Sequence, residues 1–244
     1  MRDSLIWHEV ECGGYTADLP LWEELCAPLG EDDMVMELGC GAGRVTLHLA
    51  RLDGPLVIGV DSNPALVEAV WDRGWKIRGD AEHGDVRYFN FLPGRFGLVL
   101  APMQLIQLLA DSGERISCLE TAARSMYDGA RAAFSIVEGR PVPPPEGSLP
   151  PLPDVREVDH WIYSSLPLEP QIVEGRIVLR RLRQTVDPDG EMSEELNEVE
   201  LCLLSAETLE EEARSVGLKP IGRREIPATE AHVASTVVLL EKVA

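Results

Sequence analysis

The sequence predicts an α/β protein built on a parallel β-sheet with helices on both faces. Between residues 34 and 138, short apolar runs alternate with helical patterns. The first two apolar runs are 34–38 and 56–60, and helical patterns follow them to Arg51 and through Trp71. This βαβα order is typical of a parallel sheet, because parallel strands must be joined by a crossover, which is usually a helix.

Further elements continue the same alternation. Strands are expected at 96–100 and 132–137, with a helix between them that starts near Ser112 and ends before the turn signal Asp128–Gly129. A short helix over 18–29 precedes the first strand and carries Leu21, Trp22 and Leu25 on one face. We expect this helix to cover the sheet.

The pattern changes after Glu138. Prolines between 141 and 153 exclude a helix or a central strand, so 139–154 is expected to be a connection. Period-2 segments at 156–166, 171–186 and 195–204, with turns at Glu174–Gly175 and at 187–190, predict an inserted antiparallel β-meander. Ser205 is a good N-cap for a helix over 206–216, and strands follow at 218–226 and 233–242. The chain therefore divides into 1–138, 139–204 and 205–244.

Composition narrows the classes of function. Of the 244 residues, 42 are acidic and 22 are basic, for a net charge of −20, which disfavours nucleic acid and anionic membrane surfaces as partners. The chain has no apolar stretch long enough to span a bilayer and no signal-peptide pattern at its start, so a cytoplasmic location is expected. The five cysteines lie far apart and are expected to be reduced, and the histidines lack metal-ligand spacing.

The most informative segment is the glycine loop, residues 37–44, which lies where the first strand turns into the first helix. Its glycines let the backbone bend sharply and let a ligand approach the main chain. Asp61 ends the second strand, which is where α/β cofactor sites hold ribose hydroxyls. A dinucleotide-binding loop needs a small residue at position 44, where this chain has arginine.

The pattern acid-x-Gly-x-Gly-x-Gly resembles instead the first motif of class I S-adenosylmethionine-dependent methyltransferases. Glu37, Gly39, Gly41 and Gly43 match that motif position by position. The resemblance implies a Rossmann-like, doubly wound sheet of seven mostly parallel strands with the last strand antiparallel. It also implies S-adenosylmethionine as cofactor and S-adenosylhomocysteine as product.

The resemblance suggests which residues form the cofactor site. Glu37 would contact the methionyl amine, and Tyr15 could reach the cofactor's carboxylate. The carboxylate beside the adenine is Asp85 or Asp80, and the spacing favours Asp85 with Val86 next to the ring. The full predicted set is Tyr15, Glu37, Gly39, Cys40, Gly41, Gly43, Asp61, Ser62, Asp85, Val86, Ala101 and Met103.

The acceptor side is less well defined. The segment 101–104 lacks the Asn/Asp-Pro-Pro-aromatic pattern of the DNA and protein amide methyltransferases of this class, so a small-molecule acceptor is favoured. His232 lies in the turn between the last two strands and is a candidate general base, with a surface histidine as the alternative. Glu138, His160 and Tyr163 are candidate substrate residues. The arginines of 176–183 either pair with glutamates of the next strand or recognise an acidic substrate.

These observations predict a methyltransferase that transfers a methyl group to an oxygen, nitrogen or carbon of a small molecule, as a monomer or homodimer without a metal. The alternative is a non-catalytic protein that binds S-adenosylmethionine as a regulatory or partner subunit. A nicotinamide oxidoreductase is the weaker rival, because Arg44 breaks the required loop pattern and the chain has no Tyr-x-x-x-Lys pair.

Overall fold

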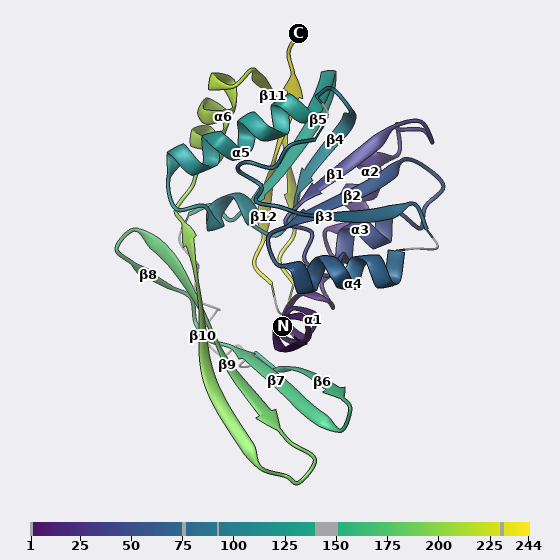
Figure 1. Ribbon diagram of the computed structural model, residues 1–244. Coiled ribbons are helices and arrows are strands. Elements are labelled where there is room, and N and C mark those ends of the chain that lie inside the picture. Colours follow the sequence, from purple (N-terminus) through teal and green to yellow (C-terminus); the bar gives the residue numbers. More distant parts are fainter. Residues whose placement is uncertain (1, 75–76, 92, 140–150, 230–231) are drawn as a thin grey trace.

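The computed structural model describes residues 2–74, 77–91, 93–139, 151–229 and 232–244. It contains an α/β unit and a separate antiparallel sheet that projects from it (Figure 1). The two come together at helix α1 (Arg2–Cys12), which contacts α4 of the first unit and strands β6 and β7 of the second. The proline-rich segment 140–150 lies outside the described residues.

The described part of the α/β unit contains a seven-stranded sheet in the order β11-β12-β5-β4-β1-β2-β3. Its strands β1 to β5 are parallel, and β12 runs antiparallel to both of its neighbours. This confirms the expected Rossmann-like topology with an antiparallel last strand. The strands are β1 (Met34–Leu38), β2 (Leu56–Asp61), β3 (Gly79–His83), β4 (Phe96–Ala101), β5 (Met126–Ile136), β11 (Leu218–Ile226) and β12 (Ser235–Lys242).

Alternating side chains of the central strands bury both faces of this sheet. Val35 of β1 packs in a cluster with Trp22 and Val45, whereas Met36 belongs to a cluster with Leu119 and Leu209 on the opposite face. The side-chain period of two in a strand explains this division. The helices are α2 (Leu19–Cys26), α3 (Arg44–Leu49), α4 (Pro64–Gly74), the 3₁₀ turn η1 (Leu105–Leu108), α5 (Ser112–Ser125) and α6 (Ala206–Ser215).

Side-chain caps explain where two helices begin. Asp111 accepts a hydrogen bond from the Glu114 amide at the start of α5, and Ser205 accepts one from the Thr208 amide at the start of α6, as its sequence position predicted. The prediction of a turn at Asp128–Gly129 is wrong. These residues lie inside β5, which begins directly after α5, and the pairing register with β4 shifts beside them, so the glycine occupies an irregularity in the strand.

The inserted sheet is built from hairpins rather than from a simple meander. Its strands are β6 (Asp154–Val158), β7 (Trp161–Pro167), β8 (Gln171–Val173), β9 (Arg176–Val186) and β10 (Met192–Cys202). The segment expected as one strand over 156–166 turns at Asp159 and His160, whereas the turn expected at Glu174–Gly175 is confirmed between β8 and β9; all four residues have positive φ. Each segment therefore forms a hairpin.

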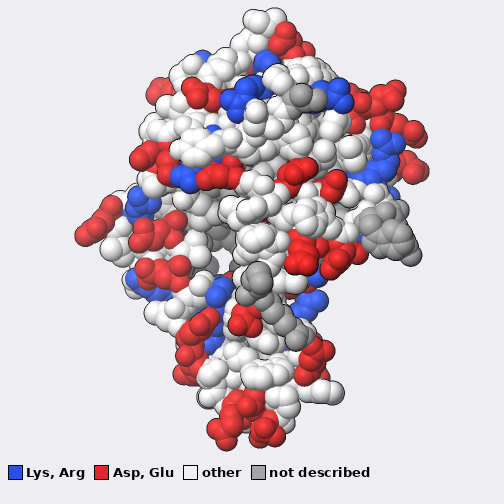
Figure 2. All heavy atoms as spheres, viewed as in Figure 1, with Lys and Arg blue, Asp and Glu red and all other residues white. Residues whose placement is uncertain are grey.

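Strand β10 is an edge of the inserted sheet, because among the described strands it pairs with β9 alone. Glutamates follow one another along it, and their side chains are exposed. In Figure 2, acidic side chains gather at the end of the inserted sheet farthest from the α/β unit. Within the described ranges, the chain contains no helix long and apolar enough to cross a membrane.

A buried ion pair joins α5 to α6. The Arg115 guanidinium donates to both carboxylate oxygens of Glu212 at 2.9 and 2.6 Å, and both side chains are less than a tenth exposed. Arg115→Met should lower the free energy of unfolding by about 3–5 kcal/mol, because it leaves the Glu212 carboxylate buried without a partner. Urea denaturation followed by circular dichroism measures the change.

Arg224→Met is the matched control. Arg224 also forms a two-bond pair, with Glu24, but both side chains are about half exposed, so its loss should cost much less. Equal losses in the two variants would contradict the importance of burial for the Arg115 pair.

Candidate functional site

The glycine loop lies at the carboxyl end of β1, immediately before α3. The amides of Gly39 and Cys40 both donate to the Val60 carbonyl of β2, at 2.7 and 3.0 Å. Gly39, Gly41 and Gly43 have φ values of 66°, 55° and 86°. This left-handed conformation favours glycine at each position, so the spacing of the glycines follows directly from the path of the chain.

Two side chains lie directly on the glycines of the loop. A Cβ at Gly39 would be 2.5 Å from Leu105 Cδ1, and a Cβ at Gly41 would be 2.1 Å from His8 Nε2. Leu105 comes from η1 beyond β4, and His8 comes from α1. Because Gly39 and Gly41 have no side chains, groups from two distant segments contact the main chain of the loop.

Asp61, at the end of β2, holds the loop through its carboxylate. Its Oδ2 accepts from the Gly41 amide at 2.9 Å and its Oδ1 accepts from the Asn63 amide at 2.8 Å. These bonds fix the carboxylate at the carboxyl edge of the sheet, beside the loop. In open α/β sheets, this edge is where ligands bind.

Glu37 is fully enclosed beneath the loop. One of its carboxylate oxygens accepts from both the amide and the hydroxyl of Thr46, at 2.7 and 2.5 Å. Burial outweighs these bonds and raises the pKa of Glu37 to about 8. At neutral pH the carboxyl group is therefore mostly protonated.

Asp85 follows β3, whereas Asp80 lies within that strand. Asp85 accepts from the Arg87 guanidinium, which holds the pKa of its carboxyl below the usual range, and Arg87 also pairs with Glu114. Asp80 instead accepts from the neighbouring Ala81 amide. The geometry therefore favours Asp85 over Asp80 as the acid of this site, and the assignment of its role stays a prediction.

These groups converge on one cavity of about 570 Å³ at the carboxyl edge of the sheet. Most of the residues predicted for the cofactor line it: Glu37, Gly39, Cys40, Gly41, Asp61, Ser62, Asp85, Val86 and Met103. Gly43, Ala101 and Tyr15 do not; Gly43 starts α3 and Ala101 is fully buried. The lining residues that sequence reasoning missed include His8, Cys12, Arg44, Arg87 and Leu105.

Tyr15 and His232 stack next to Arg44, which lines this cavity, but neither ring lines it. Their ring centroids are 4.3 Å apart, and the Arg44 guanidinium lies 5.1 Å from the Tyr15 ring. Arg44 is held in place by two hydrogen bonds to the buried carboxylate of Asp18. Burial lowers the pKa of His232, and the nearby Asp154 opposes that effect. The turn before β12 thus places His232 next to the glycine-loop edge of the sheet.

The three predicted substrate residues do not come together. Glu138 accepts from the Ala206 amide at 2.7 Å, so its carboxylate is engaged at the start of α6. Tyr163 is buried in β7 and packs edge-to-face against Trp7 of α1. His160 lies in the β6–β7 turn with a side chain that is 88% exposed. None of them lines the cavity at the glycine loop.

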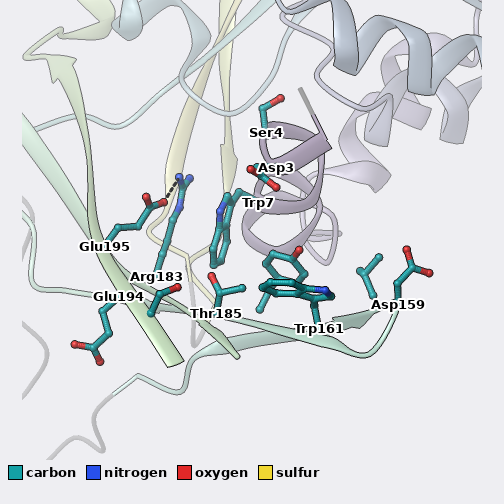
Figure 3. A pocket seen from close by; sticks show the side chains of 12 residues that line it. Asp3, Ser4, Trp7, Asp159, Trp161, Arg183, Thr185, Glu194 and Glu195 are labelled. Atoms are coloured by element: carbon teal, nitrogen blue, oxygen red, sulfur yellow. Dashed lines mark hydrogen bonds and ion pairs between the residues drawn. The ribbon is translucent and has the colours of Figure 1, made fainter. Parts of the chain in front are cut away.

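A larger hollow of about 840 Å³ lies between α1 and the inserted sheet (Figure 3). Tyr163 lines it together with Trp7 and Trp161, and its charged residues include Arg183 and Glu195, which form an ion pair. No residue of the glycine loop lines this hollow.

The arginines of β9 are paired with acids. Arg180 bonds to Glu198 across the strand pair, as the cross-strand interpretation predicted. Arg181 and Arg183 instead reach Glu11 of α1, and Arg183 also reaches Glu195. These contacts support a structural role and show that α1 supplies a partner the sequence did not reveal.

Comparison with known proteins identifies the domain. Residues 35–129 match the family described as methyltransferase domain. The part of the chain that carries the glycine loop is therefore similar to methyltransferase domains. The matched residues carry the glycine loop, Asp61 and Asp85, and the family expected from the motif is thereby confirmed.

Two curated relatives and one solved structure give the range of similar proteins. An 18S rRNA (guanine-N(7))-methyltransferase of Mus musculus is 28% identical over 123 residues, which are 47% of this chain and 42% of the relative. A 27-O-demethylrifamycin SV methyltransferase of Amycolatopsis mediterranei is 26% identical over 146 residues, 58% of this chain and 52% of the relative. This chain therefore spans about half the length of the curated relatives it matches.

The fold similarity extends over the whole chain. The structure of a sugar N-methyltransferase from Streptoalloteichus aligns with a TM-score of 0.75 and 17% identity, and the alignment covers 100% of this chain and 93% of that one. At this identity the likeness establishes the fold, including the inserted sheet, and leaves the acceptor open.

The raised pKa of Glu37 predicts a pH dependence of stability. Below about pH 4.5, Glu37 is protonated in both the folded and the unfolded chain. As the pH rises from there to about 8, the unfolded chain loses the proton and the folded protein retains it, so folding becomes less favourable. Glu37→Gln keeps an acceptor for Thr46 and removes the titration.

The difference in unfolding free energy between the wild type and Glu37→Gln should therefore shift in favour of the variant between pH 5 and pH 8. Urea denaturation at several pH values measures it. A difference that stays constant across this range would contradict the protonated state of Glu37.

Proposed function

We propose that this protein is an S-adenosylmethionine-dependent methyltransferase that transfers a methyl group to an oxygen, nitrogen or carbon of a small molecule. The convergence of the glycine loop, Asp61 and Asp85 on one cavity carries the proposal. Gly39 and Gly41 leave room for the Leu105 and His8 side chains, which pack directly on the loop at the wall of this cavity. When bound, S-adenosylmethionine supplies an electrophilic methyl group on a sulfonium sulfur.

The residues present fit this cofactor. Asp61 has carboxylate oxygens at the strand edge that can accept from ribose hydroxyls, and Asp85 and Val86, which line the same cavity, would recognise the adenine amino group. The positive charge of the methionyl ammonium group would favour the ionised form of the Glu37 carboxyl group. Cys40, Ser62 and Met103 complete the lining, while Gly43, Ala101 and Tyr15 would act as the framework around it.

A small-molecule acceptor is supported by the charge of the protein. On the face seen in Figure 2, lysines and arginines are scattered among acids and do not form a continuous basic stripe of the kind that tracks a phosphate backbone. A similar relative acts on a rifamycin and a similar structure is a sugar N-methyltransferase. Because one similar relative methylates rRNA, the experiment below also tests an RNA acceptor.

On the acceptor side, His232 would remove the proton that the acceptor loses when the methyl group arrives. Burial favours its neutral form, which is the form a base requires. Tyr163 and His160 would contribute from the inserted sheet, which we propose to act as a substrate lid or a dimer contact within residues 139–204. Glu138 would need to leave the Ala206 amide to act as a base, so His232 is the stronger candidate.

Cofactor binding is the first test. Calorimetric titration with S-adenosylmethionine and S-adenosylhomocysteine should give saturable binding by the wild type. Asp61→Asn and Asp85→Asn should each weaken it by about 10- to 100-fold, because a hydrogen bond to a charged group contributes about 1.5–3 kcal/mol. Asp80→Asn is the matched control, since Asp80 does not line the cavity, and its affinity should be unchanged.

Methyl transfer is the second test, and it separates the enzyme from a non-catalytic binding subunit. Incubation with a panel of small-molecule amines, alcohols and phenols and with an rRNA fragment should yield S-adenosylhomocysteine only with small molecules. Binding without turnover on any acceptor would favour the regulatory subunit, and turnover on the RNA alone would overturn the acceptor class. No binding by a folded wild type would overturn the proposed function.

A further inference from the structure

We propose that His8 of α1 is a cofactor-contacting residue whose imidazole closes the cavity above Gly41 and hydrogen-bonds the ribose that Asp61 binds. The inference rests on the proposed function, because it concerns the same cavity. It adds a residue from outside the methyltransferase motif and gives α1 a part in binding.

The position of the ring is the first observation. The His8 imidazole lies so close to Gly41 that a Cβ there would be 2.1 Å from its Nε2 and 2.4 Å from its Cε1. The Gly41 amide donates to Asp61, so the ring, the loop and the carboxylate form one side of the cavity. A ribose bound to Asp61 would therefore lie within reach of the imidazole.

The second observation is an incomplete set of hydrogen bonds. Among the buried side-chain nitrogen and oxygen atoms of the described residues, His8 Nδ1 is the atom without a partner. A buried polar atom without a hydrogen bond costs free energy, so a native structure needs a reason to keep one. Nδ1 is closed off from solvent, so a ligand hydroxyl in the cavity would meet Nε2, the nitrogen that lies over Gly41. Because no protein group bonds to Nδ1 and fixes the tautomer, Nε2 can either donate to that hydroxyl or accept from it.

The third observation is that α1 is held firmly from both sides. Glu9 pairs with Arg73 of α4 and with Arg156 of β6, so a single carboxylate ties α1 to the α/β unit and to the inserted sheet. Glu11 accepts from Arg183 of β9 at 2.7 and 2.8 Å. These ion pairs therefore fix the position of α1 and, with it, the direction of the His8 side chain.

The charge of His8 suits a cationic ligand. Burial lowers the pKa of His8, and Arg44 of α3 acts in the same direction, while Asp61 of β2 and the α1 residues Glu9 and Glu11 oppose them. The net effect favours the neutral imidazole at pH 7. A neutral ring can accept or donate a hydrogen bond without repelling a sulfonium ion.

Affinity measurements on three variants test the role. His8→Ala should weaken S-adenosylhomocysteine binding about 3- to 10-fold, as expected for one hydrogen bond, and His8→Asn, which keeps a donor and an acceptor, should recover part of the loss. Asp3→Asn, an exposed change on the same helix, should leave the affinity unchanged. Thermal melting without ligand shows whether each variant is folded.

A direct readout separates contact from structural support. The ¹⁵N signals of the His8 ring should shift when the wild type is titrated with S-adenosylhomocysteine and with adenosine alone, and homocysteine alone should leave them in place. A merely structural histidine would not distinguish these ligands. A response to homocysteine and none to adenosine would overturn the ribose assignment.

The failure of this inference differs from the failure of the proposed function. If the wild type binds S-adenosylhomocysteine while His8→Ala binds equally well and the ring signals do not move, only the role of His8 is overturned. If the folded wild type binds neither cofactor form, the proposed function is overturned and the role of His8 with it.

Discussion

The path of the backbone between β1 and α3 is the constraint on which the site depends. Two amides of the loop share the Val60 carbonyl, and Asp61 accepts from a third amide, so the loop is bound to β2 through its main chain. The chain can follow this path because glycines occupy its left-handed positions. Glu37 and Asp61 on neighbouring strands, Leu105 beyond β4 and His8 on α1 all lie against this turn.

Elements with strong local signals were predictable. The apolar runs of β1 and β2, the Ser205 cap of α6 and the glycine motif each depend on residues that are near one another in sequence, and the structure has them where they were expected. The hairpin turn in 156–166 was missed because its positive φ values fall on Asp159 and His160, which are not glycines. The local sequence pattern therefore does not predict such a turn.

The part of the site that was not predictable comes from long-range contacts. Apolar and polar residues are mixed along the sequence of α1. Its Ile6, Trp7 and Val10 are buried against Tyr163, which lies more than 150 positions away in the sequence. His8 belongs to no motif, and its significance appears only when α1 is laid over Gly41. In the sequence, Arg44 indicated only that the loop does not match the dinucleotide-binding pattern. In the structure, it binds Asp18 and lies near the Tyr15 ring.

The edge strand β10 has a consequence for how copies of this protein meet in solution. A strand with an open edge offers its unpaired main-chain groups to any other strand, and long edges of this kind promote aggregation. The exposed glutamates of β10 line that edge, and Glu195, Glu198 and Glu200 are paired with arginines of β9. A second strand that docked on the edge would have to displace these ion pairs, which high salt screens and acid disrupts by protonating the glutamates. The charged pairs of β10 therefore protect an open sheet edge that lies outside the cofactor cavity for most of its length.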